Sequence, residues 1–116
     1  MQILVKGRNT PVTEELRELV ERRFRKIANQ VSPLAPLEIE LCVERNPAIA
    51  DSQVAEATLY LKGKTLRAKD ASRDMPHSIN LCADELARQV KRHRDKRRKR
   101  RDAREVRQDT GAQPTV

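Results

Sequence analysis

Aromatic side chains are nearly absent from this chain: its 116 residues include one Phe, one Tyr and no Trp. A hydrophobic core must therefore be built from Leu, Ile, Val and Ala, and a chain of this length supports one domain with a single core. The same shortage removes the stacking platforms that proteins use to hold the splayed bases of single-stranded nucleic acid, and so argues against that mode of recognition.

The residues and motifs of catalysis are scarce as well. With only three glycines the chain has no phosphate-cradling glycine loop, and it contains neither a Gly-x-Ser-x-Gly elbow nor an HExxH motif. Nothing in the spacing of its carboxylates, cysteines or histidines suggests an active site. The sequence therefore predicts a protein that is not an enzyme and uses no cofactor.

Possible metal ligands are few, namely Cys42, His77, Cys82 and His93. They show no close CxxC or HxxxH pairing, whereas a structural zinc site needs four ligands at characteristic spacing. We expect no metal site, and interpret Cys82 as a small core residue. Two cysteines are too few for a disulfide framework, so free thiols in a reducing cytosol are expected.

Long apolar runs are also missing. No run approaches the ~20 residues of a membrane span, and the N-terminus, MQILVKGRN, lacks the long apolar core of a signal peptide. We expect a cytoplasmic protein that does not span a membrane.

The apolar residues that are present predict the order strand, helix, three strands, helix. Alternation predicts strands at residues 2–7, 37–44, 54–61 and 65–70, with Lys62, Gly63 and Lys64 as a hairpin turn. Helical spacing predicts a first helix from an N-cap at Thr13 to about Ala28. A second stripe predicts the last helix, capped by Asp70, Ser72 or Asp74 and with Pro76 in its first turn; it comprises Met75, Ile79, Cys82, Leu86 and Val90.

This order predicts an α+β fold, βαβββα. The helix between the first two strands favours a parallel pair, and the short later turns favour antiparallel pairs, which gives a four-stranded mixed sheet. Because each strand has a single apolar face, both helices are expected to pack on one face of the sheet. We place the domain at residues 1–90, a basic helical extension at 91–107 and a disordered tail at 108–116.

Residues 91–101, KRHRDKRRKRR, carry a formal charge of +8, which equals the net charge of the whole chain. Cations occupy every side of the helical wheel here, so no face of the segment can be buried. The run is either a solvated helix end or a binding element for a polyanion, with nucleic acid the first candidate and an anionic membrane surface the second. Recognition would use the backbone and shape of folded RNA, with counterion release.

Two further groups of cations are less clear. Arg22, Arg25 and Lys26 lie away from the apolar stripe of the first helix, but Glu18 and Glu21 stand four residues before the two arginines and could pair with them. The other group surrounds the last hairpin and either solubilises it or faces RNA; it comprises Lys62, Lys64, Arg67, Lys69 and Arg73.

Several short stretches match one known family in order and spacing. They are VKGRN at 5–9, VTEELRELVERR at 12–23, KTLRAKD at 64–70 and, most specifically, Asp74-Met75 with Ile79-Asn80, followed by Leu86, Arg88 and Gln89. Through them, residues 1 to about 95 resemble the ribosome hibernation-promoting factors, which include the ribosome-associated inhibitor and the so-called sigma modulation proteins. Pro76 and His77 stand where the family usually has Tyr, and Glu85 where a Lys is common. The chain stops at Val116 without the further domain of long members, so the short form is expected.

The resemblance implies the βαβββα fold and binding to the small ribosomal subunit and the 70S ribosome. Family members occupy the channel between head and body near the decoding centre, where they overlap the paths of messenger and transfer RNA and stop translation reversibly. The implied contacts to 16S-type ribosomal RNA are Arg22, Arg25 and Lys26 on the first helix, and Arg88, Lys91, Arg92, Arg94, Arg97 and Arg98 on the second. A monomer is expected off the ribosome.

Two other functions stay open. The first is a general binder of structured or double-stranded RNA, which transfer RNA competition and stoichiometry would separate from a ribosome-specific protein. The second is a protein-interaction modulator of the transcription machinery, whose binding would survive high salt and nuclease.

Overall fold

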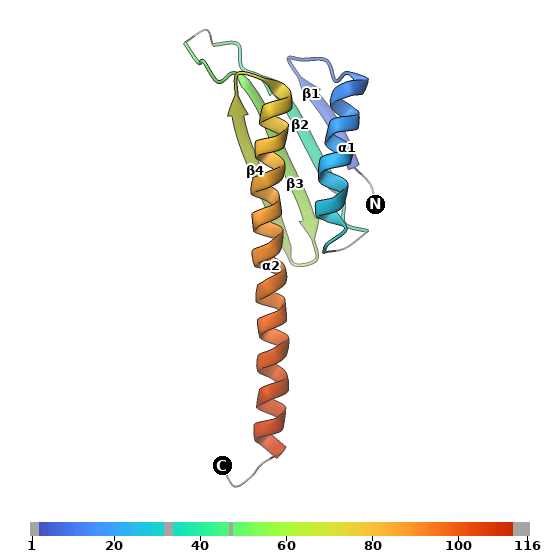
Figure 1. The fold of residues 1–116 in the computed structure, drawn as a ribbon, viewed down its shortest axis with the longest axis vertical. Coiled ribbons are helices and arrows are strands. Elements are labelled where there is room, and N and C mark those ends of the chain that lie inside the picture. The colour runs from blue at the N-terminus through green and yellow to red at the C-terminus, as the bar shows by residue number, and fades with distance from the viewer. Residues whose placement is uncertain (1–2, 32–33, 47, 113–116) are drawn as a thin grey trace.

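The computed structural model describes residues 3–31, 34–46 and 48–112, with the backbone alone at positions 28, 97 and 99–112. The elements follow the predicted order (Figure 1): β1 (Ile3–Arg8), α1 (Glu14–Ala28), β2 (Leu37–Val43), β3 (Gln53–Leu61), β4 (Lys64–Ser72) and α2 (Met75–Ala112). The molecule measures 69 × 30 × 19 Å, because α2 continues far beyond the sheet.

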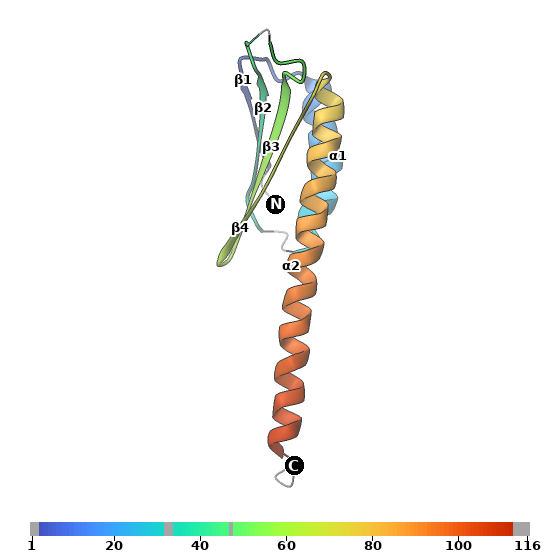
Figure 2. The same cartoon turned by 90° about the vertical axis from the view of Figure 1, so that its left-hand side faces the viewer.

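The four strands form one mixed sheet in the order β1-β2-β3-β4. β1 and β2 are parallel, whereas β2–β3 and β3–β4 are antiparallel. Figure 2 shows α1 and α2 on the same side of this sheet, with the other side uncovered. The predicted α+β fold is therefore confirmed, including the strand directions.

The core is aliphatic apart from one ring. Phe24 of α1 is the largest fully buried side chain, and it packs with alternate residues of the strands and with the stripe of α2. That stripe is buried at every predicted position, Met75, Ile79, Cys82, Leu86 and Val90. Cys82 is a core residue, as predicted: its thiol donates to the carbonyl of Ala68 at 3.3 Å, and burial raises its pKa to about 12. It therefore stays protonated at neutral pH.

Both helices begin with a side-chain cap. The hydroxyl of Thr13 accepts the backbone N–H of Leu16 at 3.2 Å, as expected of an N-cap. Of the three candidates for α2, Asp74 is the cap, because its carboxylate accepts the N–H of His77 at 3.2 Å. Ser72 has another role, since its hydroxyl lies 2.7 Å from that of Ser78 in the core. Pro76 is in the first turn of α2, as predicted.

The first strand was predicted to stop at Gly7, but β1 continues to Arg8, opposite Cys42 of β2. The chain turns one residue later, at Asn9, whose φ is 61°. Gly7 is needed for a different reason: a Cβ there would lie 2.3 Å from the carbonyl oxygen of Thr10. The glycine permits this close approach rather than ending the strand.

The last helix is longer than predicted. A tail was expected from residue 108, yet α2 is helical to Ala112, and residues 113–116 lie outside the described part of the chain. Residues 91–110 contain neither Gly nor Pro and are rich in Arg and Lys, which favour the helix, so the first stop signal is Gly111. In the described ranges, no helix combines the length and the apolar character that crossing a membrane requires.

The buried ring of Phe24 gives a test of this core. Replacing Phe24 by Ala should lower the free energy of unfolding by about 3–5 kcal/mol, because it removes a large side chain and leaves a cavity. Urea unfolding followed by circular dichroism measures the change. Ile49→Ala, at a loop side chain that is 41% exposed, is the control and should change stability little. A loss below about 1 kcal/mol for Phe24→Ala would show that the ring does not hold α1 on the sheet.

Candidate nucleic-acid interface

α2 leaves the core after Val90, the last residue of its buried stripe. Beyond this residue the helix passes the end of the sheet and projects from the domain (Figure 1). The described cations that follow Val90 are Lys91, Arg92, Arg94, Lys96 and Arg98. Arg97 is part of the same helix, but its side chain lies outside the described residues. Since successive residues turn by about 100° around a helix, this segment presents positive charge on all sides.

The cations nearest the domain point toward different neighbours. Arg94 donates from Nη1 to the side-chain oxygen of Gln30, just after α1, at 3.4 Å. Arg92 and Lys96 instead line a hollow together with Lys64 of β4. The start of the extension is thus flanked by α1 on one side and by the β3–β4 hairpin on the other.

The three cations predicted on α1 come together. Arg22, Arg25 and Lys26 line one surface hollow of about 450 Å³, with Glu18, Glu21 and Asn29. In the part of the chain that the structure describes, the ion pairs are Arg23–Asp84 and Arg88–Glu85. Glu18 and Glu21 therefore form no direct ion pair with Arg22 and Arg25 among the described residues, although they line the same hollow.

The neighbouring Arg23 has a structural role. Its guanidinium pairs with the carboxylate of Asp84 at 2.8 Å, which joins α1 to α2. This link is half-exposed and worth little stability by itself. It does help to fix the cations of α1 relative to those of α2.

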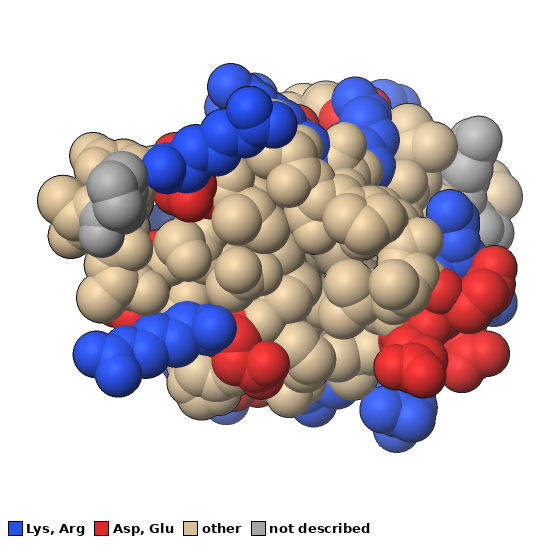
Figure 3. Space-filling model, turned by 90° about the horizontal axis from the view of Figure 1, so that it is seen from above, with Lys and Arg blue, Asp and Glu red and all other residues tan. Residues whose placement is uncertain are grey.

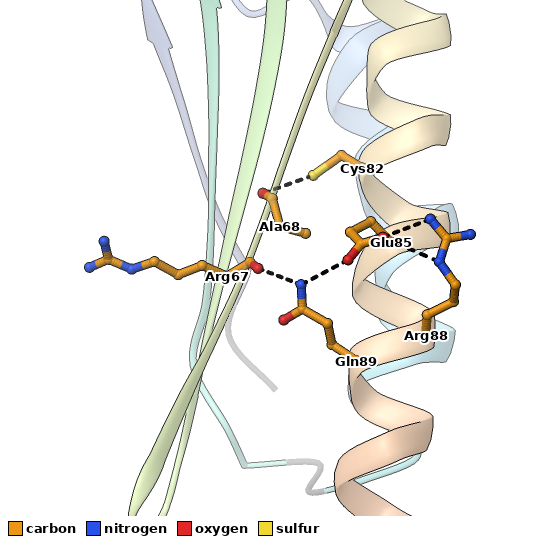
Figure 4. Close-up of polar contacts among 6 residues, drawn as sticks. All are labelled: Arg67, Ala68, Cys82, Glu85, Arg88 and Gln89. Atoms are coloured by element: carbon orange, nitrogen blue, oxygen red, sulfur yellow. Dashed lines mark hydrogen bonds and ion pairs between the residues drawn. The ribbon is translucent and has the colours of Figure 1, made fainter.

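Arg88 is already engaged within the chain (Figure 4). Its Nε and Nη2 donate to one oxygen of Glu85 at 3.2 and 2.7 Å, and Gln89 donates to the other oxygen at 3.2 Å. The hydrogen bonds from Arg88 and Gln89 hold the pKa of the Glu85 carboxyl below its ordinary value. A phosphate that binds Arg88 must therefore compete with an ionised carboxylate.

The cations around the last hairpin divide into two groups. Arg67 and Lys69 alternate with the buried Leu66 and Ala68, so they lie on the uncovered face of the sheet, and the side chain of Arg67 points away from α2 (Figure 4). Lys64 is different, because it lies at the hairpin end beside α2. Sequence reasoning left this group undivided, since spacing alone does not place the hairpin against the helix.

The opposite end of the molecule has no comparable basic surface. Seen from above (Figure 3), its middle is uncharged, carboxylates gather at one side and a few Lys or Arg side chains lie around the rim. Both helices begin near this end (Figure 1), and α1 carries Glu14 and Glu15 in its first turn. Among the residues that the structure describes, no group of three or more His, Cys, Asp or Glu could hold a metal ion.

Sequence reasoning assigned no binding or anchoring role to Thr65, Gln89 and Lys96. Gln89 donates to the carbonyl of Arg67 at 2.6 Å and so attaches α2 to β4 (Figure 4). The available signal was the spacing of Gln89, Arg92, His93 and Lys96, which is that of one helix face. This spacing was not recognised because cations occupy nearly every position of residues 91–101.

Fold and surface together define a basic βαβββα domain with a projecting cationic helix. A model of the family described as Sigma 54 modulation protein / S30EA ribosomal protein matches residues 3–98. The chain belongs to this family, which confirms the resemblance seen in its motifs.

Individual relatives agree with this assignment. The chain is 33% identical over 97 residues to a ribosome hibernation promotion factor of Picosynechococcus sp., covering 83% of this chain but only half (50%) of that protein. It is 35% identical over 96 residues to a ribosome hibernation promoting factor of Salmonella typhimurium, covering 83% of this chain and 96% of that one.

Two solved structures share the fold. The N-terminal domain of Thermus thermophilus Protein Y aligns with a TM-score of 0.67 and 26% identity, over 80% of this chain and 99% of that chain. A ribosomal subunit interface protein from Coxiella burnetii aligns with a TM-score of 0.66 and 21% identity, over 82% of this chain and 99% of that one.

The pairing of Arg88 with Glu85 leads to a test on the isolated protein. Glu85→Gln should tighten binding to a short RNA duplex roughly two- to fivefold at low salt, the size of effect expected when one exposed ion pair is released. Fluorescence anisotropy measures the affinity. Glu40→Gln removes the same charge from the uncovered face of the sheet and serves as the control. Equal gains for both variants would show that only net charge matters and that Glu85 does not restrain Arg88.

Proposed function

We propose that this protein is a ribosome-associated hibernation factor that occupies the decoding channel of the small subunit and blocks the binding of messenger and transfer RNA. The observation that carries the proposal is the continuity of α2. One helix is anchored in the core by its first half and presents a dense cationic run in its second, and the chain belongs to a family whose relatives are named for ribosome hibernation.

The two helices supply the contacts to ribosomal RNA of the 16S type. Cations on α1 and on α2 approach backbone phosphates, and the Arg23–Asp84 pair helps to hold the helices together. The contact residues are Arg22, Arg25, Lys26, Arg88, Lys91, Arg92, Arg94, Arg97 and Arg98. Because these groups bind phosphate rather than bases, the shape of the channel determines where the protein binds.

Inhibition in this scheme is steric. A molecule 69 Å long with a basic helix fills space that messenger and transfer RNA would otherwise use, and no bond is made or broken. The protein therefore works without catalysis and without a cofactor, in the cytoplasm where ribosomes translate, as a monomer when off the ribosome.

Charge neutralisation of the extension tests this function. Replacing Lys91, Arg92, Arg94, Arg97 and Arg98 by Gln should abolish co-migration with small subunits and 70S ribosomes in sucrose gradients at moderate salt. The salt dependence of binding should also weaken, with the slope falling by about one for each phosphate that the variant no longer binds.

The control is a charge-matched variant with Lys6, Arg8, Arg45, Arg67 and Lys69 replaced by Gln, all of them exposed and away from both helices. It should still co-migrate with ribosomes. Unchanged ribosome binding by the extension variant would contradict the proposal. Binding by the wild type that transfer RNA fails to compete, without a fixed one-to-one stoichiometry, would indicate a general binder of structured RNA.

A further inference from the structure

A second basic feature lies where the extension leaves the domain. A hollow of about 270 Å³ separates the start of β4 from α2, at the hairpin end of the sheet. Figures 1 and 2 show this end beside the point where α2 passes beyond the strands. The hollow is lined by Lys64, Thr65 and Leu66 of β4 and by Gln89, Arg92, His93 and Lys96 of α2.

The walls of this hollow are held in place by the fold. Lys64 pairs with Leu61 across a tight turn, in which Gly63 has a φ of 78°. On the other wall, Gln89 donates to the carbonyl of Arg67 at 2.6 Å and to Glu85 at 3.2 Å. These contacts set the distance between hairpin and helix, so the lining side chains converge from two fixed elements rather than from a loop.

The charge of the lining is of one sign. Lys64, Arg92 and Lys96 contribute three cations, and no carboxylate lines the hollow. Neither ion pair of the described residues involves these three cations. Converging positive charges without a partner repel one another, and an anion between them relieves that repulsion.

We propose that this hollow is a phosphate-binding site, and that its occupant is one backbone phosphate of the RNA strand that runs along α2. This assignment rests on the proposed function. An arginine and two lysines suit a phosphate group, because the guanidinium donates two parallel hydrogen bonds while the ammonium groups act as point charges. The volume lies just below the ~300–1,000 Å³ of sites that enclose whole small molecules, so it suits one anionic group with its water.

A fixed phosphate site does what the extension cannot. The cationic run attracts a phosphate backbone at any register, since its charges point to all sides of a helix. The hollow accepts a phosphate only at one place on the rigid domain. It would therefore set the position of the RNA relative to α2.

The first experiment uses inorganic phosphate as the probe and the full chain at constant ionic strength. Wild-type protein should show saturable amide shifts at residues 64–66 and 89–96 in NMR spectra, with no equivalent shifts for chloride. The variant Lys64→Gln/Arg92→Gln/Lys96→Gln should lose them. Lys6→Gln/Arg8→Gln/Lys69→Gln, which removes the same charge from the uncovered face of the sheet, should retain them. Linear, unsaturated shifts in the wild type would overturn the site.

The second experiment asks whether the phosphate belongs to RNA. For a short RNA duplex, the hollow variant should bind about tenfold more weakly than the sheet-face variant, as expected when charge-assisted hydrogen bonds are removed. Equal affinities, together with saturable phosphate binding by the wild type, would overturn the RNA assignment and indicate a free phosphate compound instead. Failure of the wild type to sediment with small subunits would overturn the proposed function alone, because the duplex and phosphate measurements do not use ribosomes.

Discussion

The packing of α2 against β3 and β4 is the contact on which the rest of the structure depends. The helix has 38 residues and the longest strands have nine, so at about 1.5 Å and 3.3 Å per residue the helix is nearly twice as long as the sheet. Its apolar stripe ends at Val90, and the helix passes the hairpin end of the sheet soon after, beside Lys64. The first half therefore fixes the direction of the second half, and the cationic run projects from the domain as a continuation of a buried helix.

The charges on that projecting half oppose one another. Like charges three and four residues apart destabilise a helix, whereas the high helix propensity of Arg and Lys favours it. Anchoring by the buried half supplies the costly first turns, so the remaining turns need only propagate. A bound polyanion would remove the repulsion and stabilise the same conformation, which makes the extension both a helix in the free chain and a suitable surface for phosphate.

Most of the fold could be predicted from residue patterns, because strand alternation, helix caps and helical stripes each indicate one kind of element. Alternation in LEIELCV predicted β2, the capping hydroxyl of Thr13 marked the start of α1, and the stripe from Met75 to Val90 predicted the buried half of α2. The end of β1 was predicted one residue too early, at Gly7, because the sequence does not distinguish a glycine that ends a strand from one that permits the close approach of the Thr10 carbonyl. The end of α2 was placed too early because polar composition was taken as disorder, whereas helix propensity persists to Gly111.

The candidate interface was less predictable, since side-chain rotamers and the tertiary fold, rather than spacing alone, determine which cations are paired and which lie together. Spacing allowed Glu18 and Glu21 to form ion pairs with Arg22 and Arg25, but no such pair forms among the described residues. The spacing also did not require Glu85 to form an ion pair with Arg88, because side chains three residues apart pair only in particular rotamers. The hollow beside the hairpin depends on Lys64 and Lys96, which are brought together by the length of β4 and the direction of α2.

Different groups of cations would therefore determine how tightly this protein binds RNA and where on the RNA it binds. A dense run of cations on a helix gives strong, salt-dependent attraction that carries little information about position. The cations held on the domain differ from the run because the fold fixes their positions: the three cations of α1, Arg88 in its pair with Glu85, and the cations of the hollow at the hairpin. Under the proposed function, each would accept phosphate only in a limited geometry, so an RNA would have to present phosphates at matching positions to bind all of them. Under the proposed function, an RNA folded so that its phosphates match these positions would bind more tightly than an RNA that engages the cationic run alone.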